Sequence, residues 1–133
     1  MASIVRETTV DLSPELVWDA IRDVGAVHTR LAPGFVTDTK MEEGARVVTF
    51  HNGLVARELI VTVDDAAKRL VWAVVGTQLT HHNASLQVFA GGGSSSRVVW
   101  IADVLPDKLA GVIAGMIEDS MRAMKQTLES QRT

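Results

Sequence analysis

The sequence predicts an α+β domain in which a curved, seven-stranded antiparallel sheet wraps around one long C-terminal helix. Segments of alternating or β-branched residues follow one another over residues 35–105, with turn residues between them. After Pro106 the apolar residues recur at steps of three and four, which is the period of a helix. The 133 residues fit a single domain, 1–133, whose core is large enough to need no disulfide.

The N-terminal part is predicted to contain one strand and two short helices. Residues 3–10 alternate and are rich in β-branched side chains, which is typical of a strand. Ser13 and Pro14 then occupy the N-cap and first helical position that favour a helix start. A second short helix is expected over 26–32, before the chain enters the main run of strands.

The middle of the chain is predicted to be entirely strand, followed by a single helix. Asn52-Gly53 favours a tight hairpin, because both residue types tolerate positive φ. The final helix is expected over 107–130. A sheet with one amphipathic helix buries its core by curling around that helix, which leaves a cavity between them. The six strands are expected at 35–41, 45–51, 54–64, 69–76, 81–90 and 97–105.

Composition narrows the classes of function. The chain has no cysteine, so disulfides and cysteine metal sites are excluded. The net charge is −3 and the basic residues are scattered, which argues against a nucleic-acid partner. No secretion signal and no apolar stretch of about 20 residues is visible, so we expect a cytoplasmic protein without a membrane span. His81 and His82 are adjacent and point to opposite faces of a strand, so we expect no metal and no cofactor.

An ordered set of motifs carries a family resemblance: SPELVWDAIRD, HNGLVARELIVTVDDAAKRLVW, HHNASLQV, and RVVWIADVLPD before the last helix. In this order and spacing they resemble the START-like (SRPBCC) superfamily, which includes birch-pollen-type allergens, polyketide cyclases, lipid-transport proteins and plant abscisic-acid receptors. The resemblance covers nearly the whole chain. It implies a helix-grip fold with a ligand cavity between the sheet and the long helix.

The receptor branch of this superfamily implies particular cavity positions. Glu58 matches a glutamate that faces the ligand, and segments 51–56 and 76–81 match loops that gate the cavity. Thr37 matches the lysine that holds the hormone's carboxylate, so we do not expect an acid to be held in that way. The other implied ligand-binding positions are on the strands (Trp72, Asn83, Ser85 and Trp100) and on the last helix (Val112, Met116 and Ser120).

The residues themselves leave the setting of Glu58 open. Strand 54–64 is largely apolar on both faces, so periodicity does not decide whether Glu58 faces solvent or cavity, and the resemblance favours the cavity. An unpaired carboxylate there would serve function rather than stability, so Glu58→Leu is expected to leave stability unchanged or to raise it. One of the adjacent histidines, with His81 as the candidate, is expected to line the mouth and to titrate near neutrality. Gly111 and Gly115 indicate either close approach of the sheet or space left for a ligand.

Three functions are compatible with these features. The first is binding of a small, mostly hydrophobic ligand that is lipid-, polyketide- or hormone-like. The second is an enzyme of the polyketide cyclase or dehydratase kind, with Glu58 and a histidine as the acid–base pair. The third is a ligand-gated protein-docking module formed by segments 51–56 and 76–81, and the sequence also permits a homodimer. A second titratable side chain facing Glu58 would favour the enzyme over the binding protein.

Overall fold

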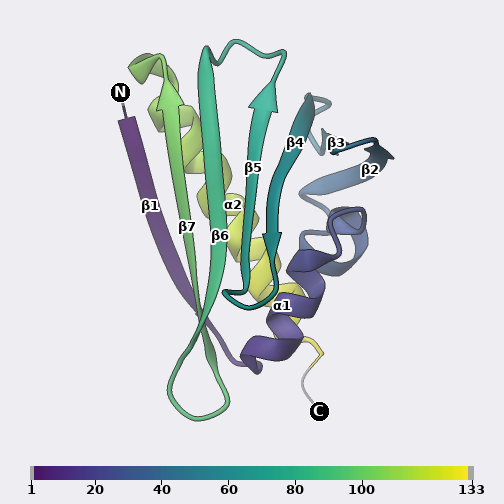
Figure 1. Ribbon diagram of the computed structural model, residues 1–133, viewed down its shortest axis with the longest axis vertical. Coiled ribbons are helices and arrows are strands. Elements are labelled where there is room, and N and C mark those ends of the chain that lie inside the picture. Colours follow the sequence, from purple (N-terminus) through teal and green to yellow (C-terminus); the bar gives the residue numbers. More distant parts are fainter. Residues whose placement is uncertain (1, 132–133) are drawn as a thin grey trace.

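The computed structural model describes residues 2–131. Within them seven strands form one antiparallel sheet in the order β1-β7-β6-β5-β4-β3-β2, and α2 crosses behind it (Figure 1). This confirms the predicted curved sheet around a long helix. The elements are β1 (Ala2–Val10), α1 (Pro14–Arg22), η1 (Val27–Leu31), β2 (Val36–Glu42), β3 (Ala45–Phe50), β4 (Val55–Asp64), β5 (Arg69–Val75), β6 (His81–Ala90), β7 (Ser96–Leu105), η2 (Asp107–Leu109) and α2 (Ala110–Glu129).

The two short helices follow β1 as predicted, but the second one is a single π-helical turn. In α1 the Ser13 hydroxyl accepts a hydrogen bond from the Leu16 N–H, and Pro14 opens the helix. In η1 the Ala32 N–H donates to the Val27 carbonyl five residues back, at 2.8 Å. This wide turn points Val27 and Leu31 toward the space between sheet and helix.

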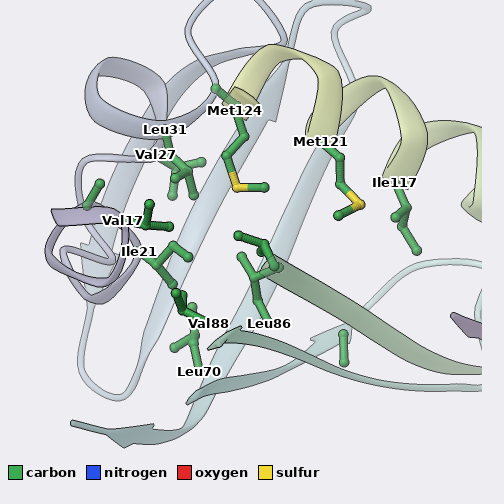
Figure 2. Packing of buried hydrophobic residues seen from close by; sticks show 14 of the residues in the cluster. Val17, Ile21, Val27, Leu31, Leu70, Leu86, Val88, Ile117, Met121 and Met124 are labelled. Atoms are coloured by element: carbon green, nitrogen blue, oxygen red, sulfur yellow. The ribbon is translucent and has the colours of Figure 1, made fainter. Parts of the chain in front are cut away.

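The C-terminal helix is present, and its regular α-helical part begins three residues later than predicted. Asp107–Leu109 form a 3₁₀ turn after Pro106, and the α-helix starts at Ala110. Figure 2 shows Met121 and Met124 pointing from α2 toward Leu86 on the sheet. The buried residues recur at helical spacing and form the face that packs on the sheet, namely Ile117, Met121, Met124 and Leu128.

Strand pairing decides which side chains face the helix. Leu86 of β6 pairs with Trp100 of β7, and Ala84 pairs with Ala102. Residues directly opposite each other share a face, so even-numbered residues of both strands point inward. Asp103 therefore points outward, and its carboxylate accepts a hydrogen bond of 2.6 Å from the Ser3 hydroxyl.

Strand β4 contains a bulge that sets the direction of its polar residue. Its register with β5 shifts between Ile60 and Thr62, and the intervening Val61 is 55% exposed. On the N-terminal side of this bulge, Glu58 and Ile60 share a face. The bulge therefore lets this half of β4 face the helix independently of the half that follows.

No helix within residues 2–131 is long and apolar enough to cross a lipid bilayer.

Candidate ligand-binding cavity

A cavity of about 480 Å³ lies between the concave face of the sheet and the N-terminal half of α2. Cavities of about 300–1,000 Å³ commonly hold small organic ligands. Its walls are mostly apolar, and the side chains that form them include Val27, Leu31, Val36, Val48, Phe50, Leu70, Trp72, Val74, Leu86, Trp100, Ile113, Met116 and Ile117. An apolar molecule would be desolvated over most of its surface here.

A buried ion pair forms the polar part of this wall. Arg46 and Glu58 lie directly opposite each other on β3 and β4, and Arg46 Nε donates to Glu58 Oε1 at 2.8 Å. Their side chains are only 6% and 9% exposed. Arg46 Nη1 also donates to the Val24 carbonyl at 3.2 Å. Two charges at this depth are tolerated because each compensates the other.

Arg46 of the ion pair lies against Trp72, which in turn packs on Trp100. The Arg46 guanidinium carbon lies 5.7 Å from the centroid of the Trp72 ring, within the range of a cation–π contact. The Trp72 and Trp100 rings meet edge to face, with centroids 5.3 Å apart and planes at 73°. The charged pair and the aromatic pair therefore form one continuous surface on the cavity wall.

His82, rather than His81, is the histidine that lines the cavity. Its Nδ1 accepts a hydrogen bond of 3.0 Å from the backbone N–H of Val74 on the adjacent strand. Burial, together with the neighbouring His81, lowers the pKa of His82 to about 4, against a smaller opposing effect of a hydrogen bond with the His82 backbone. The expectation of a cavity histidine that titrates near neutrality was therefore wrong.

The structure brings six of the ten sequence-predicted ligand positions to the cavity wall. Contact of any of them with a ligand stays a prediction, because cavity lining alone does not test it. The six residues are Glu58, Trp72, Trp100, Val112, Met116 and Ser120.

The remaining four predicted positions do not line the cavity. Asn83 and Ser85 have odd numbers on β6, so they point to the convex face, opposite to Leu86 and the other inward residues. His81 is exposed for the same reason. Thr37 is exposed at an irregularity of β2, where its hydroxyl donates to the Thr49 carbonyl at 3.3 Å.

Sequence reasoning missed Arg46, the residue that most changes the chemistry of Glu58. The signal was the hairpin between the two strands, whose loop comprises His51–Gly53, with Phe50 N–H donating to the Leu54 carbonyl. Gly53 has φ of 88°, as the last residue of such a three-residue loop requires. A three-residue loop at this point places Arg46 opposite Glu58, whereas a two-residue loop at Asn52-Gly53 would offset the two strands by one residue.

Exposed apolar residues surround the mouth of the cavity. Leu54, Val55 and Val112 all line it and remain 57%, 57% and 61% exposed. Segments 51–56 and 76–81 both contribute residues to this rim. That these segments close over a ligand stays a prediction.

The glycines of α2 lie in open surroundings. A Cβ built on Gly111 or Gly115 would meet no atom within 4 Å. Close approach of the sheet is therefore not the reason for glycine at either position.

Within residues 2–131, no group of three histidine, aspartate or glutamate side chains is arranged to hold a metal ion.

Comparison with known families decides the relationship of the chain. The family model described as "Polyketide cyclase / dehydrase and lipid transport" matches residues 1–129. The chain belongs to this family. No curated protein matches it at a significant level.

Solved structures share the fold of this polyketide cyclase/dehydrase and lipid transport domain at low identity. XoxI from Bacillus cereus is 20% identical with a TM-score of 0.88, and the match covers 100% of both chains. An uncharacterized Bacillus thuringiensis protein is 19% identical with a TM-score of 0.86, covering 96% of this chain and 98% of that one.

A plant enzyme lies within the same fold. Norcoclaurine synthase from Thalictrum flavum, solved in complex with dopamine and hydroxybenzaldehyde, is 16% identical with a TM-score of 0.73. The match covers 99% of this chain and 88% of the synthase chain. At these identities the three structures establish the helix-grip fold and leave the ligand to be argued from the cavity.

Proposed function

We propose that this protein binds one small, neutral, mostly apolar molecule of lipid or polyketide type in the cavity between sheet and α2. The observation that carries the proposal is the buried Arg46–Glu58 pair. Within the described chain, these two residues and His82 are the ionisable side chains that line the cavity. Arg46 and Glu58 neutralise each other, so the cavity presents polar atoms without a net charge.

The neutral pair disfavours charged ligands of either sign. A carboxylate next to the pair would gain from Arg46 but would be repelled by Glu58, and an amine would meet the reverse. Either ion would also lose its hydration on entering an apolar cavity, without an unpaired charge to compensate it. A neutral ligand avoids both costs.

The same pair can orient a neutral ligand by hydrogen bonds. Among residues 2–131, neither Glu58 Oε2 nor Arg46 Nη2 has a hydrogen-bond partner. The carboxylate oxygen can accept from a ligand hydroxyl, and the guanidinium nitrogen can donate to a hydroxyl or carbonyl oxygen. Ser120 adds a hydroxyl from the opposite wall on α2. A few polar groups in an apolar cavity are the usual form of a specific small-molecule site.

An acid–base enzyme is the second candidate, because Glu58 and His82 share the cavity. Glu58 pairs with Val74, which hydrogen-bonds to His82, so the two residues lie two strand spacings apart, or about 10 Å between backbones. A substrate could lie between them. However, a histidine with a pKa of about 4 is unprotonated near pH 7 and is a weak base. Glu58 is held by Arg46, so binding without turnover fits the pair better.

The test compares matched neutral and anionic ligands. Dodecanol and dodecanoate have the same chain, and Nile red supplies a neutral fluorescent probe that either compound can displace. We expect saturable Nile red binding at pH 7.5 and displacement by dodecanol at a lower concentration than by dodecanoate. Native mass spectrometry of freshly purified protein would look for a co-purifying neutral molecule.

Matched variants assign the binding to the cavity. Met116→Trp should fill part of the cavity and weaken Nile red binding, while Leu16→Trp, at an exposed position of α1, should not. Tighter binding of dodecanoate than of dodecanol would contradict the neutral-ligand proposal. Unchanged binding in Met116→Trp would locate the probe elsewhere.

A further inference from the structure

The hydrogen bond on His82 fixes the position of its proton. Val74 N–H donates to His82 Nδ1 at 3.0 Å, so Nδ1 carries a lone pair rather than a hydrogen. A neutral imidazole has one N–H, and it must then lie on Nε2. The backbone of β5 therefore makes His82 a hydrogen-bond donor at the far side of its ring.

The surroundings keep His82 in this neutral form. The ring is half-buried in the cavity wall. Protonation of Nδ1 would break its hydrogen bond with Val74, because two N–H donors would then point at each other. Its charged or titratable neighbours are His81 on the same strand and the mutually neutralising Arg46 and Glu58 across the cavity. Burial, with His81, keeps the pKa of His82 near 4, so the donor is unchanged throughout the physiological pH range.

The Nε2–H has no acceptor within residues 2–131, although it belongs to a residue that lines the cavity. The ring is half-buried, so water or a ligand oxygen can reach the Nε2–H, and a ligand oxygen that accepts from it keeps the donor paired when the ligand expels water from the cavity. Glu58 is paired with Arg46, and its backbone lies about 10 Å from that of His82 by strand spacing, so we expect a ligand rather than Glu58 to supply the acceptor.

We infer that His82 Nε2–H selects ligands that carry a carbonyl oxygen, as in a ketone, quinone or ester, directed toward β6. This inference rests on the proposed function, since it names the chemical class of the neutral ligand. The carbonyl would accept from His82, while a hydroxyl elsewhere on the ligand could reach the Arg46–Glu58 pair. The two polar points would fix the orientation of an otherwise apolar molecule across the concave face.

The experiment uses 9-fluorenone and fluorene, which are rigid, neutral and nearly identical in shape, and which differ in a carbonyl against a methylene group. Displacement of Nile red gives both affinities. We expect the wild-type protein to bind fluorenone roughly tenfold more tightly than fluorene, the effect of one additional hydrogen bond in the complex.

Two substitutions of His82 separate its two ring nitrogens. His82→Asn keeps an acceptor for Val74 near the Nδ1 position and withdraws the Nε2 donor, so the preference for fluorenone should disappear. His82→Gln keeps an N–H near the Nε2 position and should restore most of the preference. His81→Asn, on the exposed neighbour, is the matched control and should behave as wild type.

The outcomes distinguish the inference from the proposed function. Equal affinity of the wild-type protein for the two compounds would leave neutral-ligand binding in place and overturn the role of His82. Absence of saturable binding of Nile red and of both compounds would contradict the proposed function, and the inference would fall with it. Long-range ¹H–¹⁵N NMR of the wild-type protein at pH 7 is independent of ligand, and a hydrogen on Nδ1 of His82 would also overturn the inference.

Discussion

Arg46 and Glu58 face each other across β3 and β4 with 2.8 Å between Nε and Oε1; both side chains are buried, and the Arg46 guanidinium lies over the Trp72 ring. Each charge is the main compensation for the other at this depth. The pair therefore behaves as one structural unit, in which the loss of one member changes the environment of the other.

Glu58→Leu should lower the free energy of unfolding by about 3–5 kcal/mol, because it leaves the buried Arg46 charge without its partner. This reverses the expectation from sequence, where Glu58 had no partner. Urea unfolding would measure the change. The double variant Arg46→Met/Glu58→Leu should recover most of the loss, since an apolar pair of similar volume is often as stable as a buried ion pair. A single Leu variant as stable as wild type would show that Arg46 does not depend on Glu58.

The depressed pKa of His82 predicts a loss of stability in acid. Its pKa is about 4 in the folded protein against 6.5 without the fold, so the unfolded state binds more protons between these values. The contribution of the neutral His82 to the free energy of unfolding is complete above pH 6.5 and declines as the pH falls toward 4. We expect it to be about 1–2 kcal/mol after allowance for partial exposure.

Comparison with a variant isolates this contribution from the titration of carboxylates. The free energy of unfolding should fall less between pH 7.5 and pH 4.5 in His82→Phe than in wild type. His81→Phe should keep the wild-type pH dependence, since His81 is exposed. Identical slopes in wild type and His82→Phe would mean that the His82 pKa is not depressed in solution.

Gly115→Ala should raise the free energy of unfolding by about 0.5–1 kcal/mol. The position lies inside α2, where glycine is less favourable than alanine, and an added Cβ would meet no atom within 4 Å. Thermal unfolding followed by circular dichroism would measure the gain. Gly25→Ala is a useful contrast, because its Cβ would lie 3.1 Å from Met41 Cγ. A loss of stability in Gly115→Ala would indicate that neighbouring side chains approach this part of α2 more closely than the structure has them.

Tryptophan fluorescence should report the occupancy of the cavity. Trp72 and Trp100 line it, while Trp18 is fixed outside the lining by a hydrogen bond of 2.9 Å from its Nε1 to Asp65. Nile red should therefore quench the emission saturably, and Trp100→Phe should reduce the amplitude of quenching. Trp18→Phe should retain it. If Trp18→Phe removed the quenching instead, the probe would bind near α1 rather than in the cavity.

The fold was predictable because its signals are periodic and repeated. Alternation over the strands and the three- and four-residue steps after Pro106 each span many residues, so an error of one or two at an end leaves the architecture intact. The same tolerance covers η1, where the helical turn was expected but its π-helical width was not.

The residues of the site depend on which alternate positions of each strand face inward, and hydrophobic periodicity alone does not determine this. Asn83 and Ser85 were expected in the cavity beside Trp100, but the pairing of Leu86 with Trp100 puts odd residues of β6 on the other face. For the same reason His82 faces the cavity, whereas His81, the predicted residue, faces solvent. Arg46 was missed because its position opposite Glu58 depends on whether the hairpin loop has two residues or three. A change of one residue in the length of a turn shifts the strand register and thereby reverses which side chains face the core.

Because of the bulge at Val61, the direction of Glu58 can change without a change in the core residues that pack near the C-terminal half of β4. Before the bulge, Glu58 faces the helix, and after it Val63, itself 41% exposed, pairs with Leu70, so the residues on that face of the sheet change from even to odd numbers along one strand. Deletion of Val61 would join the two halves in a single phase. With the C-terminal half held by its pairing to β5, Glu58 would rotate to the convex face and leave Arg46 alone, while Leu70 kept its position. A protein engineer could thus remove the polar anchor by shortening the chain by one residue, without replacing any side chain in the cavity.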